Sequence, residues 1–241
     1  MPAQTTLLLG GTGRTGGRVL NFLLKRDVAV RAIVRSAQRL PQELIASHRL
    51  EIIEADLLSM PQEVFAGHLR GCDAVVSCLG HNLSFKGVFA PPYALVTRAA
   101  QRVCRAARTL RPASPLRFVL MSSVSVHRPG GLDALRSSRE KAFLWVLRGV
   151  LPPAMDNQNA ADFLQKNIGP EDPFIRWVAV RPDSLKGGEV TPYTIHEGLV
   201  ASLFKPDQTN MANVADFMAA LVTDRKVWQR WESKLPVIVN A

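Results

Sequence analysis

The sequence is short of the residues that build metal centres, disulfide frameworks and membrane spans. It has three cysteines, at 72, 78 and 104, and none forms a C-x-x-C pair. The five histidines are scattered without the spacing of zinc ligands. No apolar run approaches the roughly 18 residues that cross a bilayer, and the first predicted strand leaves no room for a signal peptide. We therefore expect reduced thiols, no bound metal, no membrane partner and a cytoplasmic protein.

Positive charge and apolar side chains are what the sequence has in excess. Thirty Lys and Arg residues outnumber twenty Asp and Glu residues, giving a formal net charge of +10, and 47% of the residues are hydrophobic. Over 241 residues this composition suffices for one large core, and no repeat, low-complexity run or linker divides the chain. We predict a single domain, 1–241.

Basic residues recur along the helix predicted within 92–111. Arg98, Arg102, Arg105 and Arg108 are three or four residues apart, and apolar side chains occupy the opposite face. Such a stripe attracts nucleic-acid phosphates whatever their base sequence. No aromatic residue alternates with these arginines, and no nucleic-acid-binding motif accompanies them. We interpret the stripe as a solvated helix face, with nucleic-acid binding as an unlikely alternative.

A glycine-rich turn follows the apolar run at 7–9. Gly10, Gly13 and Gly16 have G-x-x-G-x-x-G spacing and precede an amphipathic stretch, 19–24. The first glycine suits a tight turn, the second lets the backbone approach a pyrophosphate, and the third lets helix and strand pack closely. The helix N-terminus offers unpaired N–H groups to the phosphates. We predict a dinucleotide site rather than a turn without a ligand. Its predicted contacts here are Gly10, Thr12, Gly13, Arg14, Thr15 and Gly16.

This motif, with a strand before it and a helix after it, resembles that of the short-chain dehydrogenase/reductase superfamily, whose extended and atypical members share the spacing. The resemblance covers nearly the whole chain and is most specific in the first 125 residues. It implies an α/β fold, a Rossmann-type doubly wound parallel sheet with a small C-terminal cap on the substrate side. We assign the cap to about 183–212 and the C-terminal segment. The predicted strands are 7–9, 28–34, 50–54, 73–78, 117–121, 177–181 and 235–239.

The residues after the second predicted strand favour NADP(H) over NAD. An Asp or Glu about 20 residues past the glycines would hold the ribose 2′-hydroxyl of NAD. The sequence instead has Arg35 and Ser36 there. Arg35 can pair with a 2′-phosphate and Ser36 adds a hydroxyl donor. Arg31 and Arg39 are near enough in sequence to assist.

Two further strand ends supply cofactor contacts that the resemblance implies. Asp56 follows strand 50–54, where related proteins bind the adenine amino group, and the backbone of Leu57 would line that pocket. The alternative for Asp56 is to cap the helix that starts near Pro61. Leu79 and Gly80 follow strand 73–78 and would pass beside the ribose and pyrophosphate.

The strand ends at 121 and 181 are expected at the nicotinamide. Ser122 and Pro182 follow these strands and would border the ring, since ligands bind at the carboxyl edge of an open parallel sheet. Ser123 takes the place of the superfamily's catalytic Ser or Thr. The equally weighted alternative is that such serines only hydrogen-bond the next turn.

The proton-transfer pair of the superfamily is missing. An active member has a Tyr followed four residues later by a Lys that lowers the phenol pKa. The sequence has only Tyr93 and Tyr193, and neither has a Lys at that distance. Aligning the segment 156–166 with the helix that normally carries the pair puts Ala154 at the Tyr position and Gln158 at the Lys position. The polar Asp156, Asn157 and Gln158 of this segment are candidates to face the cofactor, and none of them is assigned as an acid.

Two functions remain open. An NADP-dependent reductase of the atypical group, similar to flavin, biliverdin or isoflavone-type reductases, would pass hydride to a small organic acceptor and take the proton from solvent. A non-enzymatic NADP-binding sensor resembling NmrA-like regulators would act on a protein partner. We favour the reductase slightly. Its substrate pocket has as candidates Phe85, Phe89, Tyr93, His127 and Tyr193. A sensor would need an exposed surface, for which the region 228–231 is the candidate.

Overall fold

The structure is a computed structural model that describes residues 4–80, 93–128, 133 and 135–241. An eight-stranded sheet forms its middle layer, in the order β3-β2-β1-β4-β5-β6-β10-β8. All neighbours are parallel except β8, which runs antiparallel to β10. This order confirms the Rossmann-type doubly wound sheet. The strands are β1 (Thr5–Leu9), β2 (Ala29–Val34), β3 (Leu50–Glu54), β4 (Ala74–Ser77), β5 (Leu116–Met121), β6 (Ile175–Pro182), β8 (Tyr193–His196) and β10 (Val237–Asn240).

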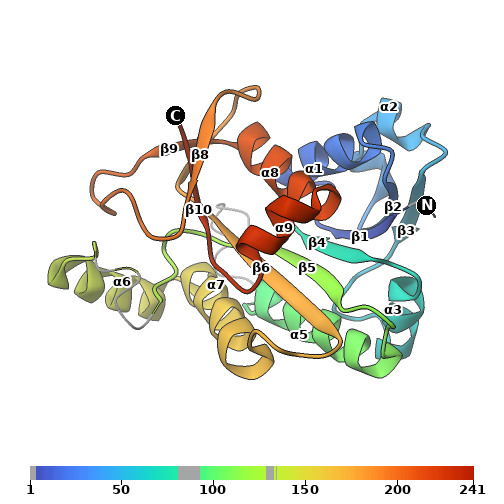
Figure 1. Ribbon diagram of the computed structural model, residues 1–241, viewed down its shortest axis with the longest axis horizontal. Helices are drawn as coiled ribbons and strands as arrows, with labels where there is room; N and C mark the ends of the chain where they lie inside the picture. The colour runs from blue at the N-terminus through green and yellow to red at the C-terminus, as the bar shows by residue number, and fades with distance from the viewer. Residues whose placement is uncertain (1–3, 81–92, 129–132, 134) are drawn as a thin grey trace.

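Helices cover both faces of the sheet (Figure 1). On one face α1 (Arg14–Lys25) packs against α8 (Met211–Thr223), which in turn contacts α9 (Arg225–Trp231). On the other face α5 (Leu95–Leu110) lies between α3 (Gln62–Leu69) and α7 (Pro152–Phe163). The helix α2 (Gln42–Ile45) follows β2, a π-helical turn (Leu164–Ile168) continues α7, and α6 (Ser138–Val150) precedes α7.

The first strand shows why the sheet is buried on both sides. Leu7 and Leu9 belong to the core under α3 and α5, whereas Leu8 belongs to the core under α1 and α8. Successive side chains of a strand point to opposite faces, so a strand with helices on both sides must be apolar throughout. All three leucines are at most 1% exposed. The sheet edge at the carboxyl ends of the strands is thereby held rigidly.

The segment 183–212 divides between two sheets. Its strands β7 (Ser184–Lys186) and β9 (Gln208–Asn210) form a separate two-stranded parallel ladder. Its strand β8 joins the main sheet through β10, so residues 193–196 and the C-terminal strand extend the sheet. The helix α8 follows β9 directly in the chain, and α6 begins at Ser138.

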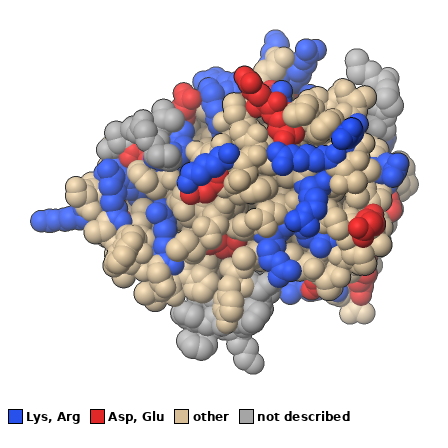
Figure 2. Space-filling view, turned by 90° about the horizontal axis from the view of Figure 1, so that it is seen from below, with Lys and Arg blue, Asp and Glu red and all other residues tan. Residues whose placement is uncertain are grey.

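The arginine-striped helix is α5, whose apolar face is buried against the sheet. Arg98, Arg105 and Arg108 are exposed, and basic side chains are spread over this side of the molecule (Figure 2). Arg102 is half-buried and donates to the Met60 carbonyl at 2.6 Å. Arg108 pairs with Asp172 at 2.6 Å. Two of the four arginines therefore hold neighbouring segments in place.

None of the helices described is long and apolar enough to pass through a bilayer. Nor do three His, Cys, Asp or Glu side chains gather anywhere in the described ranges as a metal ion would require. All three cysteines are free thiols.

Candidate functional site

The glycine turn between β1 and α1 is fixed by close backbone packing. Gly10 has a φ of +82°, and a Cβ there would lie 2.8 Å from both the carbonyl carbon and the oxygen of Cys78. A Cβ on Gly16 would lie 2.1 Å from the Gly10 oxygen. Gly13 donates its N–H to the same oxygen at 3.0 Å and is the N-cap of α1. The outer two glycines are thus required by packing, while Gly13 is exposed at the helix N-terminus.

A cleft of about 880 Å³, partly open to solvent, lies at the carboxyl ends of β1 to β4. We call it the main cleft. Eight of the predicted cofactor contacts line it: Gly10, Thr12, Gly13, Arg35, Asp56, Leu57, Leu79 and Gly80. Its other lining residues are Leu9, Ile33, Val34, Arg39, Ala55, Leu58, Cys78 and Leu95. The sequence pattern at four separate strand ends therefore converges on one cavity.

The remaining predicted contacts lie beside the main cleft. Arg14 lines a neighbouring groove on the α1 side of the glycine turn, together with Arg39. Thr15 and Gly16 are buried in the first turn of α1. Ser36 precedes the short 3₁₀ turn Ala37–Arg39.

The end of β2 is basic, and its nearest acid is already engaged. Arg35 and Arg39 are exposed and both line the main cleft. Glu54 ends β3, next to Val34 in register, and accepts a hydrogen bond from the Ala37 N–H at 2.8 Å. This role could not be predicted from the sequence, because an acid at a strand end usually points to solvent. The carboxylate fixes the turn that carries Arg39.

Asp56 caps the turn that precedes α3, whose own N-cap is Pro61. Its Oδ1 accepts hydrogen bonds from the N–H groups of Leu58 at 2.8 Å and Ser59 at 3.0 Å. The hydrogen bond from Ser59, with help from Leu58 and the charge of Arg35, lowers the pKa of this carboxyl. Its Oδ2 accepts no hydrogen bond from the described residues. Asp56 thus combines the turn-capping role with a carboxylate oxygen still available at the cleft.

The serines at the end of β5 lie on the same sheet edge, outside the lining of the main cleft. Ser122 donates its N–H to Val180 at 2.7 Å, and the Val124 N–H donates to the Pro182 carbonyl at 3.2 Å. These bonds hold the ends of β5 and β6 side by side. The Ser122 hydroxyl is buried without a hydrogen-bond partner. Ser123 Oγ accepts from the Ser125 N–H at 3.2 Å, so its O–H remains free to donate.

The helix α7 uses its polar residues to hold the fold together. The Asp156 carboxylate accepts from the N–H groups of Val96 at 2.7 Å and Thr97 at 2.9 Å, at the N-terminus of α5. Gln158 bonds both backbone groups of His127, accepting from its N–H at 2.9 Å and donating to its carbonyl at 3.1 Å. Asp156 and Gln158 are therefore structural in their described contacts. These contacts satisfy backbone groups of neighbouring segments, and the expectation that the two residues face the cofactor stays a prediction.

The residues suggested for a substrate pocket do not converge. The Tyr193 hydroxyl donates to Asp216 at 2.6 Å, and Asp216 pairs with Arg26 at 2.6 Å, so this tyrosine lies against α8 and α1. Tyr93 is 50% exposed. The His127 Nδ1 is buried without a hydrogen-bond partner, and burial lowers the pKa of the ring. The expectations for residues 85 and 89 lie outside the described residues.

In the region suggested as a sensor's partner surface, the two tryptophans are buried while Gln229 and Arg230 between them are exposed. Trp228 and Trp231 are 5% and 6% exposed, and the Trp231 ring packs edge-on against Phe217. Their apolar area is already removed from water by α8. These two side chains therefore cannot supply an exposed contact surface.

A buried charge cluster beside Pro182 escaped the sequence analysis. Arg181 and Arg128 both pair with Asp133, at 2.9 and 3.0 Å, and none of the three side chains is more than 4% exposed. Burial acts to raise the pKa of Asp133, but the hydrogen bonds from the two arginines lower it overall. Arg181 Nε also donates to the Leu235 carbonyl at 2.9 Å. The only signal in the sequence was an arginine closing an apolar strand.

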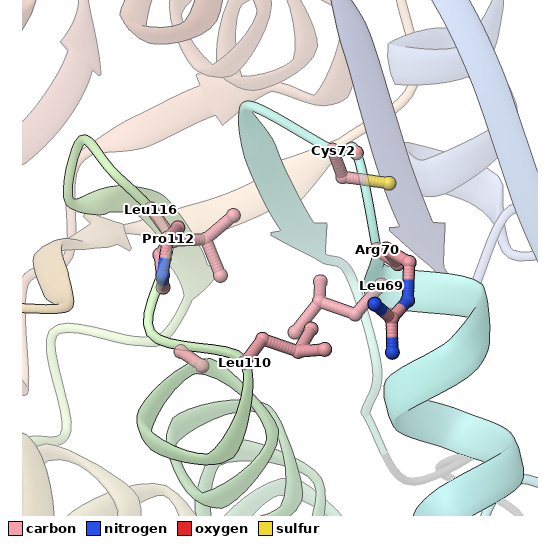
Figure 3. Close-up of a pocket in the computed structure, with 8 residues that line it drawn as sticks. Leu69, Arg70, Cys72, Leu110, Pro112 and Leu116 are labelled. Carbon is pink, nitrogen blue, oxygen red and sulfur yellow. The ribbon is translucent and has the colours of Figure 1, made fainter.

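A second hollow lies at the opposite edge of the sheet, where β4 and β5 begin (Figure 3). Its walls are apolar, with Leu69, Leu110 and Leu116 facing one another and Cys72 at the rim. Burial raises the pKa of the Cys72 thiol to about 11, so the thiol is protonated at neutral pH. This hollow is separated from the glycine turn by the length of the strands and contributes nothing to the candidate site.

Comparison with known proteins agrees with this geometry. A family model described as NAD(P)H-binding matches residues 10–225, and the chain belongs to this family. Among curated proteins, none matches the sequence.

Several solved structures share the fold. The oxidoreductase YlbE from Lactococcus lactis is 20% identical, with a TM-score of 0.70 over 99% of this chain and 91% of that one. ChuY, an anaerobilin reductase from Escherichia coli O157:H7, is 18% identical, with a TM-score of 0.68 over 98% and 97%. A short-chain dehydrogenase/reductase from Veillonella parvula in complex with NADP is 14% identical, with a TM-score of 0.67 over 98% and 94%. At these identities the likeness shows the fold alone.

Proposed function

We propose that the protein is an NADP(H)-dependent oxidoreductase that reduces a small organic acceptor without a Tyr-Lys pair. The observation that carries this proposal is the main cleft, in which the glycine turn faces two exposed arginines at the end of β2. The solved reductases of the same fold support the reaction class, and the NADP complex among them supports the cofactor.

The residues of the main cleft suit the pyrophosphate, ribose and adenine parts of NADP(H), and the ends of β5 and β6 beside the cleft suit the nicotinamide. The exposed N-terminus of α1 at Gly13 would hold the pyrophosphate through its backbone N–H groups. Arg35 and Arg39 would pair with the 2′-phosphate, and Asp56 Oδ2 would accept from the adenine amino group. Ser122 and Pro182 would border the nicotinamide. When bound, the cofactor supplies a hydride for the acceptor.

The proton must come from elsewhere than a tyrosine. Ala154 and Gln158 stand where the pair belongs, and Gln158 is occupied by His127. Water at the open cleft would therefore supply the proton. We assign to Ser123 the role of hydrogen-bonding the acceptor's oxygen, because its O–H is free while its oxygen is fixed by Ser125.

The missing pair also supports the second candidate, an NADP-binding sensor of the NmrA-like type without turnover. The two functions share the cleft and differ only in what happens to bound cofactor. A sensor would also need a partner surface other than Trp228 and Trp231, because both side chains are buried.

Calorimetric titration of NADPH and of NADH into the purified protein tests the proposal first. We expect NADPH to bind at least tenfold more tightly, and we then expect one or more of a panel of quinones, flavins and aldehydes to oxidise bound NADPH. Tight binding without turnover on the whole panel would favour the sensor. Failure to bind either cofactor would overturn both functions.

A further inference from the structure

The helix α6 carries an apolar face that none of the described residues covers. It stands at one side of the molecule, away from the sheet (Figure 1). Along its whole length, only Glu140 and Leu144 are buried. The exposed fractions are 79% for Trp145, 61% for Val150 and 53% for Val146. Large apolar side chains this exposed are unusual when they occur together.

The exposed apolar residues of α6 have the spacing of the apolar face of an amphipathic helix. Ala142, Trp145, Val146, Gly149 and Val150 follow the pattern i, i+3, i+4, i+7, i+8. In a globular protein this spacing marks the side that faces the core. In α6 all five residues are exposed. The pattern therefore leaves an apolar stripe of α6 exposed to solvent.

Phe204 extends this surface from the neighbouring segment, residues 202–207. Its ring meets that of Phe143 edge-on, with 5.6 Å between centroids, and the two side chains are 62% and 45% exposed. The segment is fixed to α6 because the Glu140 carboxylate accepts from the Leu203 N–H at 2.6 Å and the Ser202 hydroxyl at 3.0 Å. We call the exposed apolar residues of α6 together with Phe204 the α6 face.

Positive charge surrounds the α6 face. Arg139 and Lys141 are exposed on the helix, and Lys205 is exposed in the neighbouring segment. Glu140, the one acid of α6, is buried in its hydrogen bonds. Asp207, the next acid along the neighbouring segment, accepts a hydrogen bond from the following backbone N–H. The surface therefore offers apolar side chains and cations to a partner.

We propose that the α6 face docks on an anionic lipid bilayer, with α6 lying in the plane of the membrane surface. Trp and Phe favour the boundary between headgroups and acyl chains, aliphatic side chains reach below it, and cations meet the lipid phosphates. A second copy of the chain fits less well, because its α6 face carries the same cations and its one acid on α6, Glu140, is buried, so that face offers no anion to Arg139 and Lys141. The expectation of no membrane partner rested on spanning segments, and a surface helix needs none.

Docking in this way would bring one end of the candidate site to the membrane. Arg148 donates from α6 to the Ser125 carbonyl at 2.8 Å, and Arg136 donates to the Val124 carbonyl. These carbonyls directly follow Ser123. The α6 face is thus tied to the loop at which the acceptor is expected. The docking surface itself does not depend on the proposed function.

Trp145 is a built-in reporter of docking. The other tryptophans, Trp177, Trp228 and Trp231, are 2%, 5% and 6% exposed, so an environmental change at the α6 face alters Trp145 first. The full-length protein is titrated with phosphatidylcholine vesicles, with and without one third phosphatidylglycerol, while emission and co-sedimentation are measured. We expect a blue shift and sedimentation with the anionic vesicles and little of either with the neutral ones. In the W145F variant we expect sedimentation to persist and the shift to disappear.

Two matched variants separate specific docking from attraction by net charge. Val146→Asp changes the α6 face, and Val64→Asp makes the same change at a position of α3 with 47% exposure. We expect V146D to weaken binding to anionic vesicles by about tenfold or more and V64D to leave it nearly unchanged. The double variant R139Q/K141Q should weaken it by roughly twentyfold.

Three results would overturn the proposal. Absence of any blue shift or sedimentation with anionic vesicles would exclude an anionic bilayer as the partner of the α6 face. Equal losses in V146D and V64D would reduce the effect to the net charge of the whole chain. A blue shift that grows with protein concentration, without vesicles, would make the α6 face a contact between protein chains. Cofactor binding is measured on the same samples, so failure here is distinct from failure of the reductase.

Discussion

The two halves of the sheet edge are held in place by different forces. At β1 to β4 the backbone itself makes the site, through glycines that allow contacts such as the Gly10 oxygen against Gly16. At β5 and β6 the chain is held by buried side chains, notably Arg181 on Asp133, 48 residues apart in sequence. A backbone-built half presents N–H groups and suits phosphates, which vary little among ligands. A half built from side chains can change with each substitution and suits the part of a site that selects an acceptor.

The largest expected effect is on stability, at the buried charges beside the ends of β5 and β6. Asp133→Ala would leave Arg128 and Arg181 buried without their common partner, and we expect a loss of about 3–5 kcal/mol in the free energy of unfolding. Urea denaturation measures it. The control is Glu197→Ala, because Glu197 pairs with Lys234 at 3.2 Å while 55% exposed, and we expect it to cost at most about 1 kcal/mol. Similar losses in both variants would contradict the distinction between the halves.

Substitutions at two glycines of the turn between β1 and α1 should affect stability and cofactor binding differently. Gly16→Ala places a Cβ 2.1 Å from a carbonyl oxygen, so we expect a loss of about 2–3 kcal/mol in unfolding free energy. Gly13→Val adds bulk at the exposed helix N-terminus, so we expect it to abolish binding of both NADPH and NADH with a smaller loss of stability. Thermal denaturation and calorimetric titration are the measurements. Normal cofactor binding by G13V would show that the glycine turn takes no part in binding the cofactor.

Arg35 should determine the choice of cofactor. Arg35→Ala removes a partner of the 2′-phosphate, which NADH lacks, so we expect NADPH affinity to fall about tenfold to a hundredfold and NADH affinity to stay constant. Arg105→Ala removes one exposed charge from α5, outside the cleft, and should change neither. Equal losses of affinity for NADPH and NADH in R35A would contradict the preference for NADP(H).

Ser123 should matter to turnover only. We expect Ser123→Ala to lower kcat about tenfold, as for the loss of one hydrogen bond to the acceptor, with NADPH affinity unchanged. Steady-state kinetics with any acceptor from the panel measures the change. An unchanged kcat would leave the Ser123 hydroxyl with its structural bond to Ser125 alone.

The smallest effect concerns acid conditions. Hydrogen bonds from the Ser137 and Leu203 N–H groups lower the pKa of Glu140 from 4.5 to about 2. A carboxyl whose pKa is lowered by folding stabilises the fold above its unfolded value, and this contribution is lost as the pH falls from about 4.5 toward 2. Glu140→Gln should therefore be less stable at pH 6 and should lose less further stability on acidification. Parallel pH profiles for E140Q and the unmodified protein would contradict this.

What the sequence predicted follows the same division. The strands, the glycine turn and the basic end of β2 were predictable because each depends on neighbours within a few residues or on strand periodicity, while the doubly wound arrangement followed from the family resemblance. The roles of Asp156, Gln158 and Arg181 were not, because their partners lie 31 to 60 residues away and no spacing rule connects them. Asp56 shows both cases. Its position at the cleft could be predicted because it follows the end of a strand, whereas its hydrogen bonds within the turn were seen only in the structure. The assignment of cofactor contacts stays a prediction.

The position of β10 has a consequence for how the chain folds. It lies between β6 and β8, so within the described part of the chain β8 pairs only with a strand that begins 41 residues later, at Val237 after His196. Until β10 pairs with β6, the edge of the growing sheet is β6 and the segment of β8 has no ladder to join. Such a late, long-range pairing is slow relative to local contacts. Completion of the sheet is therefore a distinct closing step, and a strand edge is open to wrong partners until it occurs.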